Sequence, residues 1–120
     1  MNFDISQVLE TGGGNFNIDG LAIEMDSGYS VSLPGFEFKM PMEGITQDKI
    51  MDQGFAIAAL IEAGNLNHYY VGCRITEGYL WMDISTNIFE YGNAMAFARA
   101  GRQKAIFCFA TKEELTVIYP

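Results

Sequence analysis

The sequence predicts an α+β protein: an antiparallel sheet of hairpins with two helices packed on it. Short runs of alternating apolar and polar residues, separated by turn dipeptides such as Pro34-Gly35, are typical of antiparallel strands, because glycine supplies the positive φ of tight turns. Two other segments, residues 46–64 and 87–101, instead repeat their apolar residues at helical spacing. The resulting order is strands, a helix, two strands, a helix and two strands. This order is typical of a sheet that carries its helices on one face.

The first forty residues are expected to form a meander of short strands. Tyr29, Val31 and Leu33 alternate with two serines, which is the pattern of a half-exposed strand. Asp-Gly, Asp-Ser-Gly and Pro-Gly turns separate this strand from its neighbours. The expected strands of this half are residues 16–18, 21–25, 29–33 and 36–40.

The first expected helix lies between Thr46 and Gly64. Thr46 is placed to cap the N-terminus, Asp48 lies in the first turn, where the helix dipole favours an acid, and Gly64 fits the C-terminal end. Gly54 inside the helix costs about 1 kcal/mol relative to alanine. We therefore expect a kink or a close neighbour at Gly54. The apolar stripe consists of Ile50, Phe55, Ile57, Leu60 and Ile61.

The second half is expected to form a hairpin, a helix and a final hairpin. Asn87 and Glu90 have the spacing of a capping box at the start of this helix, and Gly101 fits its end. The helix is apolar nearly all round, which indicates burial in a core or cover by a second copy of the chain. Because a small domain has little room to wrap a helix, we expect a homo-oligomer. The expected strands are residues 68–75, 79–84, 104–110 and 115–119.

Length and charge limit the function. The 120 residues fit one domain, residues 1–120. Residues 1–64 contain ten acidic and two basic residues, whereas residues 65–120 contain five of each. Because a net-acidic surface is repelled by nucleic acid and by anionic membranes, we expect neither as a direct partner. The N-terminus lacks a signal-peptide pattern and the longest apolar run is seven residues, so a soluble, cytoplasmic protein is expected.

No set of residues in the sequence predicts catalysis, a metal or a cofactor. Cys73 and Cys108 are expected to be reduced core residues, with a disulfide as the alternative. His68 is the single histidine and has no metal-ligand spacing, so it is expected at the protein surface or at a hairpin edge. Asp83 has no second acid in a catalytic pairing and is expected to end its strand. The protein is therefore expected not to be an enzyme.

The glycines at residues 12–14 raise the alternative of a phosphate-binding loop. Such a loop needs a buried strand before it, a helix after it and usually a lysine followed by serine or threonine. The sequence around Gly14 has none of these features. A flexible bend between two strands is the preferred interpretation.

Three basic residues, Arg99, Arg102 and Lys104, fall within six residues at the end of the second expected helix. Basic residues at this position neutralise the free carbonyls and the negative end of the helix dipole, which is the simplest interpretation. Two alternatives remain open: an anion or nucleotide site, which Arg74 could join, and an interface with an acidic partner. Arginine suits phosphate, and aromatic rings can stack on a base. The aromatic candidates are Tyr69, Tyr79, Trp81, Phe89 and Tyr91.

Residues 79–115 resemble small proteins of phages and mobile elements. The resemblance rests on the strand ending at Asp83, the capped helix with its alanine and arginine positions, and the "QKAIF" strand that follows. In size and layout the chain is similar to phage counter-defence proteins, which include sponges for cyclic nucleotide signals and inhibitors of immune effectors. The ligand contacts that the resemblance implies are Asn87 and Arg102, with Arg74 and Arg99 in support. Tyr91 is a further expected ligand contact, as a ring on which a base could stack.

Two functional hypotheses follow. The first is a non-catalytic, oligomeric counter-defence protein that sequesters a small phosphorylated, nucleotide-derived immune signal. The second is an acidic protein that blocks the nucleic-acid-binding surface of a bacterial immune effector, such as a CRISPR complex. A hydrolase using Asp83 and His68 is a distant third.

Overall fold

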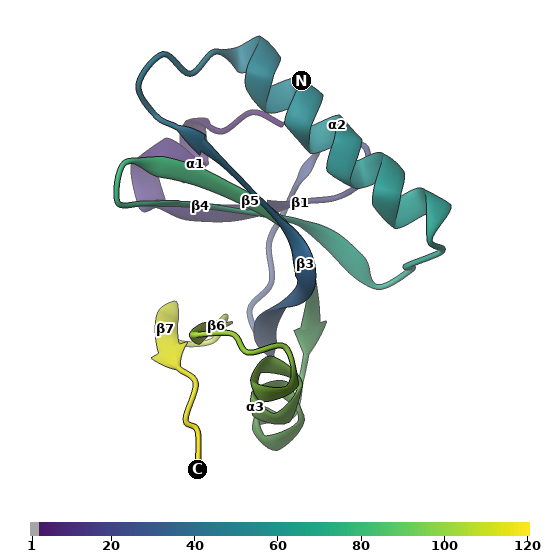
Figure 1. Cartoon of the computed structure of the whole chain (residues 1–120), viewed down its shortest axis with the longest axis vertical. Helices are drawn as coiled ribbons and strands as arrows, with labels where there is room; N and C mark the ends of the chain where they lie inside the picture. The colour runs from purple at the N-terminus through teal and green to yellow at the C-terminus, as the bar shows by residue number, and fades with distance from the viewer. Residues whose placement is uncertain (1–2) are drawn as a thin grey trace.

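A seven-stranded antiparallel sheet organises residues 3–120, the part of the chain that the computed structural model describes (Figure 1). The strand order is β2-β1-β4-β5-β3-β6-β7, and three helices accompany the sheet, so the α+β class is confirmed. The elements are α1 (Ser6–Thr11), β1 (Gly13–Phe16), β2 (Ala22–Ile23), β3 (Tyr29–Pro41), α2 (Gln47–Ala63), β4 (Tyr69–Thr76), β5 (Tyr79–Ile88), α3 (Tyr91–Ala100), β6 (Ala105–Cys108) and β7 (Glu113–Thr116).

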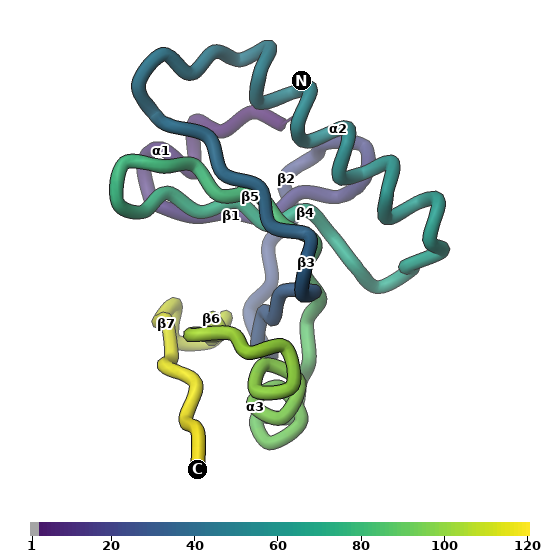
Figure 2. The backbone as a smooth tube through the Cα atoms, viewed as in Figure 1, coloured from purple at the N-terminus to yellow at the C-terminus, as the bar shows by residue number. Residues whose placement is uncertain are grey.

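All three helices pack on the same face of the sheet. Alternate residues of β5 show this, because Met82 and Ile84 belong to the core that contains α1 and α2, and Ile88, on the same side of the strand, packs in the core under α3. In Figures 1 and 2, α2 lies at one end of the molecule, and α3, β6 and β7 lie at the other. The opposite side of the sheet carries no helix, and we call it the helix-free face.

Both ends of α2 agree with the sequence prediction. The Thr46 hydroxyl accepts a hydrogen bond from the backbone N–H of Lys49 at 3.2 Å, and Gly64 follows the last helical residue. The close neighbour expected at Gly54 is the fully buried ring of Phe3, whose nearest atom would lie 2.7 Å from a Cβ at this position. Gly54 therefore lets the N-terminal segment pack directly on the helix.

The prediction that a turn at Pro34-Gly35 separates two strands is wrong. A single strand, β3, runs through both residues and pairs with β5 on both sides of them. The register shifts between Ser32 and Glu37, so extra residues bulge out of β3. Proline is tolerated at a bulge because it has no N–H to contribute to the ladder, and Gly35 adopts a φ of 85° there.

The predicted start of α3 is also wrong. Strand β5 continues to Ile88, and α3 begins at Tyr91 after Glu90, without a side-chain cap. Asn87 therefore lies in the strand, where its amide donates to the carbonyl of Ser27 at 2.9 Å. The pairing of β5 with β3 extends the strand over the residues that resembled a capping box. The end of α3 at Gly101 agrees with the prediction.

Helix α1 was not expected, and the glycine run is not a bend between two strands. Gly12, with a φ of 90°, ends α1, whereas the next two glycines belong to β1. A Cβ on Gly14 would lie 3.0 Å from the Val8 side chain, so this glycine allows α1 to pack closely on its own strand. The glycine run therefore allows α1 to end and to pack closely on β1.

Both predicted hairpins of the second half form, but the second strand of the last one begins at Glu113 rather than at the predicted residue 115. Strands β4 and β5 meet at Glu77-Gly78, and both residues have positive φ values, 54° and 82°. Strands β6 and β7 pair from Cys108↔Glu113 to Ala105↔Thr116. Between β1 and β2 a shorter hairpin than expected forms, with two paired positions.

Candidate ligand-binding site on the helix-free face

Polar and aromatic side chains gather on the helix-free face of the three central strands. Residues that pair directly across strands point to the same face, and Trp81 pairs with Arg74 on one side and Lys39 on the other. Asp83, two residues along β5, pairs with Gly72 and Glu37. Further along, this face carries Ser30, Ser32, Tyr70 and Ser85.

Two cations flank the ring of Trp81. The Lys39 Nζ lies 5.4 Å from the Trp81 ring centroid and 4.7 Å from that of Tyr79, and the Arg74 guanidinium carbon lies 5.8 Å from that of Trp81. Because β3 and β4 border β5 on opposite sides, the cations approach Trp81 from both sides. The Trp81 Nε1 is buried and has no hydrogen-bond partner among the described residues. We call Lys39, Arg74, Tyr79 and Trp81 the cation–aromatic cluster.

An ion pair links this cluster to the β6–β7 hairpin. The Arg74 Nη1 lies 3.5 Å from the Glu114 Oε2, and the two side chains are 51% and 61% exposed. In a flat sheet, β4 and β7 would be four strand spacings apart, or about 19 Å. The contact therefore requires a sheet curled into a half-barrel, with the helix-free face inside the curl.

Asp83 lies beside the cluster and is held by two serines. The Ser85 and Ser32 hydroxyls donate to its carboxylate at 2.6 Å and 2.8 Å. A Cβ on Gly72 would overlap this carboxylate, so only glycine fits opposite Asp83. Burial raises the pKa of Asp83, and the serine hydrogen bonds oppose that shift. Asp83 does not end its strand, as the sequence suggested, but lies in the middle of β5.

Gln103 joins the same region to the end of α3. Its carboxamide accepts from the Ser32 N–H at 3.2 Å and donates to the Ser32 carbonyl. Backbone pairing of β3 with β6 is limited to Tyr29 and Ser30, so the Gln103 side chain takes the place of a strand partner at Ser32. Sequence analysis missed Gln103, whose only signal was an uncharged polar residue between two basic ones. It also missed Lys39, which only the register places beside Trp81.

The arginines expected to form one site are spread over different elements. Arg74 lies on β4, Arg99 lies in the last turn of α3, and Arg102 follows that helix with a φ of 56° and an exposed side chain. Arg99 donates to the Ile118 carbonyl at 3.3 Å. Within residues 3–120 no hydrogen bond, ion pair or cation–π contact joins Arg99 or Arg102 to Arg74. In the described part of the chain, Arg74 is the one of these three arginines with a cation–π contact to a ring predicted for stacking.

Asn87 and Tyr91, the other two predicted ligand contacts, pack against groups of the protein itself. The Asn87 amide binds the Ser27 carbonyl and contacts the Met25 sulfur at 3.4 Å, which fixes the segment before β3. The Tyr91 ring packs edge-on against Tyr29, with 5.5 Å between their centroids. Neither side chain contacts the cation–aromatic cluster in the described part of the chain.

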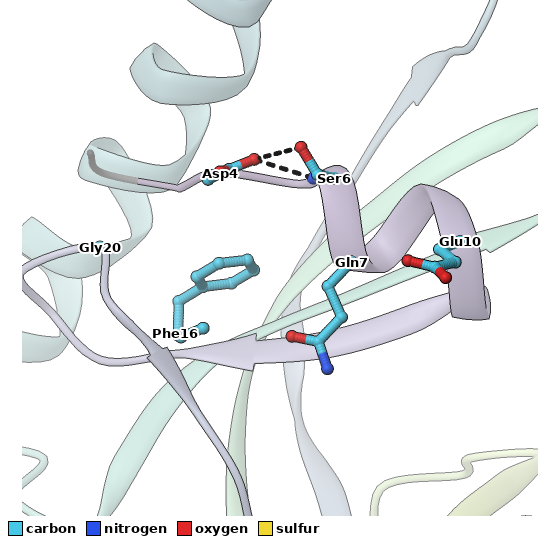
Figure 3. Close-up of a pocket in the computed structure, with 7 residues that line it drawn as sticks. Asp4, Ser6, Gln7, Glu10, Phe16 and Gly20 are labelled. Carbon is cyan, nitrogen blue, oxygen red and sulfur yellow. Dashed lines mark hydrogen bonds between the residues drawn. The ribbon is translucent and has the colours of Figure 1, made fainter.

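Two pockets lie away from the cluster and are lined without any basic side chain. The pocket between α1 and the β1–β2 hairpin has a volume of about 390 Å³, and the one at the end of α2 about 270 Å³. In the first (Figure 3), the Asp4 carboxylate accepts from the N–H and hydroxyl of Ser6 at 3.0 Å and 2.6 Å, Glu10 and Gln7 add acceptors, and Phe16 supplies an apolar wall. Such linings suit a cation better than a phosphate.

The single histidine and the two cysteines lie outside the cation–aromatic cluster. No group of three His, Cys, Asp or Glu side chains is placed there to hold a metal ion. His68 is exposed just before β4, as expected for a surface residue. Cys73 and Cys108 are buried and unpaired, and burial raises the pKa of the Cys73 thiol, so that it stays protonated.

None of the helices in residues 3–120 combines the length and apolar character needed to cross a membrane. Comparisons of the chain with protein-family models, curated proteins and solved structures give no match. We therefore infer function from the geometry of the helix-free face and from the distribution of charge.

Proposed function

We propose that the protein is a non-catalytic binding protein that captures a small phosphorylated, nucleotide-derived ligand at the cation–aromatic cluster. The supporting observation is that Lys39 and Arg74 flank Trp81, whose buried N–H has no partner in residues 3–120. A phosphate supplies negative charge to Lys39, which has no carboxylate within ion-pair distance among the described residues, and it offers several acceptor oxygens. The exposed Arg74 side chain offers its planar fork to the phosphate, and Tyr79 offers a ring for stacking.

Sequestration needs tight binding without a chemical step. This requirement agrees with a site that has cations and aromatic rings but no paired acid, base or nucleophile at the cluster. The resemblance to counter-defence proteins suggests that the ligand is an immune signal in the cytoplasm of a bacterial host. The apolar character of α3 and the exposed Phe89 and Tyr91 rings favour a homo-oligomer, in which a second copy completes the wall of the site.

Calorimetric titration with cyclic dinucleotides, cyclic trinucleotides and ADP-ribose tests the proposal. Quenching of Trp81, the single tryptophan, gives a second readout at the site itself. We expect Arg74→Ala and Lys39→Ala each to weaken binding at least tenfold, with the exposed Arg102→Ala as the matched control. Loss of binding in Arg102→Ala alone would move the site to the end of α3, as the sequence suggested. Absence of binding to the whole panel would refute ligand capture.

We propose as a second candidate an acidic inhibitor that docks on the basic, nucleic-acid-binding surface of an immune effector. All ten acidic side chains of residues 1–64 are exposed. Arg74 and Glu114 form the one ion pair within residues 3–120, so no basic partner neutralises any of these acids. Both pockets also lack basic residues. An unneutralised acidic surface attracts a basic partner and mimics the charge of nucleic acid.

Displacement of fluorescent target DNA from a guide-loaded CRISPR effector complex tests this candidate. Inhibition is expected to fall steeply with salt, because exposed charges are screened. Asp48→Asn combined with Asp52→Asn, on the exposed side of α2, is expected to weaken inhibition. The matched control combines Glu77→Gln with Glu90→Gln, which removes the same charge elsewhere. Equal inhibition by both double variants would argue against docking through the first half.

A further inference from the structure

We propose that Glu114 is an internal competitor for the anion-binding position of the cation–aromatic cluster. Its carboxylate pairs with the Arg74 guanidinium when no ligand is bound, and an incoming phosphate displaces that carboxylate. This inference rests on the proposed capture function and adds the regulation of the same site.

The strand register places Glu114 on the face that carries the cluster. Glu114 pairs with Phe107 of β6, and Phe107 pairs with Ser30 of β3, so all three side chains point to the helix-free face. Glu113, one residue earlier, points to the opposite side of the same strand. The chain therefore provides two adjacent glutamates, of which one meets Arg74 and the other cannot.

The contact between Glu114 and Arg74 is made by the curl of the sheet rather than by neighbouring strands. Three strands separate β4 from β7, yet the charged groups lie 3.5 Å apart. The carboxylate thus holds the free edge of the curled sheet against the site. A phosphate ligand carries the same sign of charge to the same guanidinium, so both cannot bind Arg74 in full.

The balance of contacts at Arg74 favours displacement of the Glu114 carboxylate by a phosphate. Both partners of the ion pair are more than half exposed, and exposed pairs contribute little to stability. Lys39 has no carboxylate within ion-pair distance among the described residues, so a phosphate gains a second cation that Glu114 does not reach. The ligand therefore exchanges one weak contact for two.

The edge strand that carries Glu114 has few backbone partners, whereas the base of its hairpin is anchored in the core by the buried Ile106 and Val117. Strand β7 is an edge strand of four residues that pairs with β6 alone. Strand β6 in turn pairs with β3 at only two positions, Tyr29↔Cys108 and Ser30↔Phe107. A short, lightly paired edge opens at lower cost than the central strands.

Titration of Glu114→Gln and Glu113→Gln with inorganic pyrophosphate tests the inference, with Trp81 fluorescence and calorimetry as readouts. Both variants lose one negative charge from the same strand, so any long-range effect of charge is matched. We expect Glu114→Gln to bind about two- to fivefold more tightly than Glu113→Gln, the range expected for freeing a partner from an exposed ion pair. Equal affinities, or no binding of pyrophosphate by either variant, would overturn the inference.

Failure of the capture function would look different. If wild type and Glu114→Gln bind no member of the nucleotide panel, the proposed ligand class is wrong. A tighter binding of pyrophosphate by Glu114→Gln than by Glu113→Gln would still show the competition by Glu114. Circular dichroism and thermal melting of each variant show whether the fold is kept.

Discussion

Gln103 is predicted to stabilise the fold by replacing a missing strand partner. Its carboxamide satisfies both backbone groups of Ser32, at a position that β6 does not reach. The informative change is Gln103→Ala, which removes both side-chain hydrogen bonds. It keeps the hydrogen bond that the Tyr119 hydroxyl donates to the backbone carbonyl of residue 103 at 2.6 Å.

The expected loss follows from two backbone groups left without partners. A buried polar group without a hydrogen bond costs about 1–3 kcal/mol. Because Ser32 is half-buried, water compensates in part, so the lower end of this range applies to each group. We therefore expect Gln103→Ala to lower the free energy of unfolding by about 2–3 kcal/mol.

Gln103→Glu separates the donor from the acceptor. The carboxylate of the variant still accepts from the Ser32 N–H, but it cannot donate to the Ser32 carbonyl and places a negative charge beside it. We expect a loss of stability at least as large as that of Gln103→Ala at neutral pH.

Urea unfolding followed by Trp81 fluorescence measures these losses. The control is Lys104→Ala, which changes an exposed side chain one residue away and is expected to shift stability by less than about 0.5 kcal/mol. A Gln103→Ala variant as stable as this control would refute the role assigned to Gln103.

Three further changes test the structure. Gly54→Ala is expected to lower the free energy of unfolding in urea by about 1–2 kcal/mol, because the added methyl group would overlap the Phe3 ring. A gain in stability of about 1 kcal/mol, which is usual for this change in an open helix, would contradict this packing. Because the pKa of Asp83 is raised in the folded state, its contribution to stability is complete at acid pH and is lost as pH rises above the unfolded value of 3.8. Asp83→Asn should remove this fall from the urea midpoints as pH is raised above the unfolded pKa. An unchanged slope would assign the fall to other groups. Phe89, just before α3, is 70% exposed, and Tyr91, its first residue, is 45% exposed. We therefore expect sedimentation at micromolar concentration to show an oligomer, and Phe89→Ser to weaken it. A wild-type monomer would rule out self-association.

The elements that the sequence predicted well are those decided by neighbours along the chain. The ends of α2 follow from Thr46 and Gly64, which act within one helical turn, and the β4–β5 hairpin follows from Glu77-Gly78, which sets the turn by its own backbone angles. The Gly54 neighbour was also foreseen, because glycine inside an apolar stripe needs a reason. The identity of that neighbour, Phe3, was not.

The failed predictions concern segments whose partners lie far away in the sequence. Pro34-Gly35 carries the local signal of a hairpin, but β5 pairs with both flanks and keeps β3 continuous. Asn87 carries the signal of a helix cap, but pairing with Ser30 keeps it in β5. In both cases hydrogen bonds along a paired strand outweighed a local preference of about 1 kcal/mol.

The same division applies to the candidate site. Sequence alone determined the charge imbalance and the presence of cations and aromatic rings in the second half. Tertiary structure decided which of them meet: Arg102 and Arg99 stay at a helix end, whereas Arg74 joins Trp81 and Lys39 from strands that are distant in sequence. The physical reason is that register and sheet curl, which depend on the pairing of the whole chain, determine which side chains share a face.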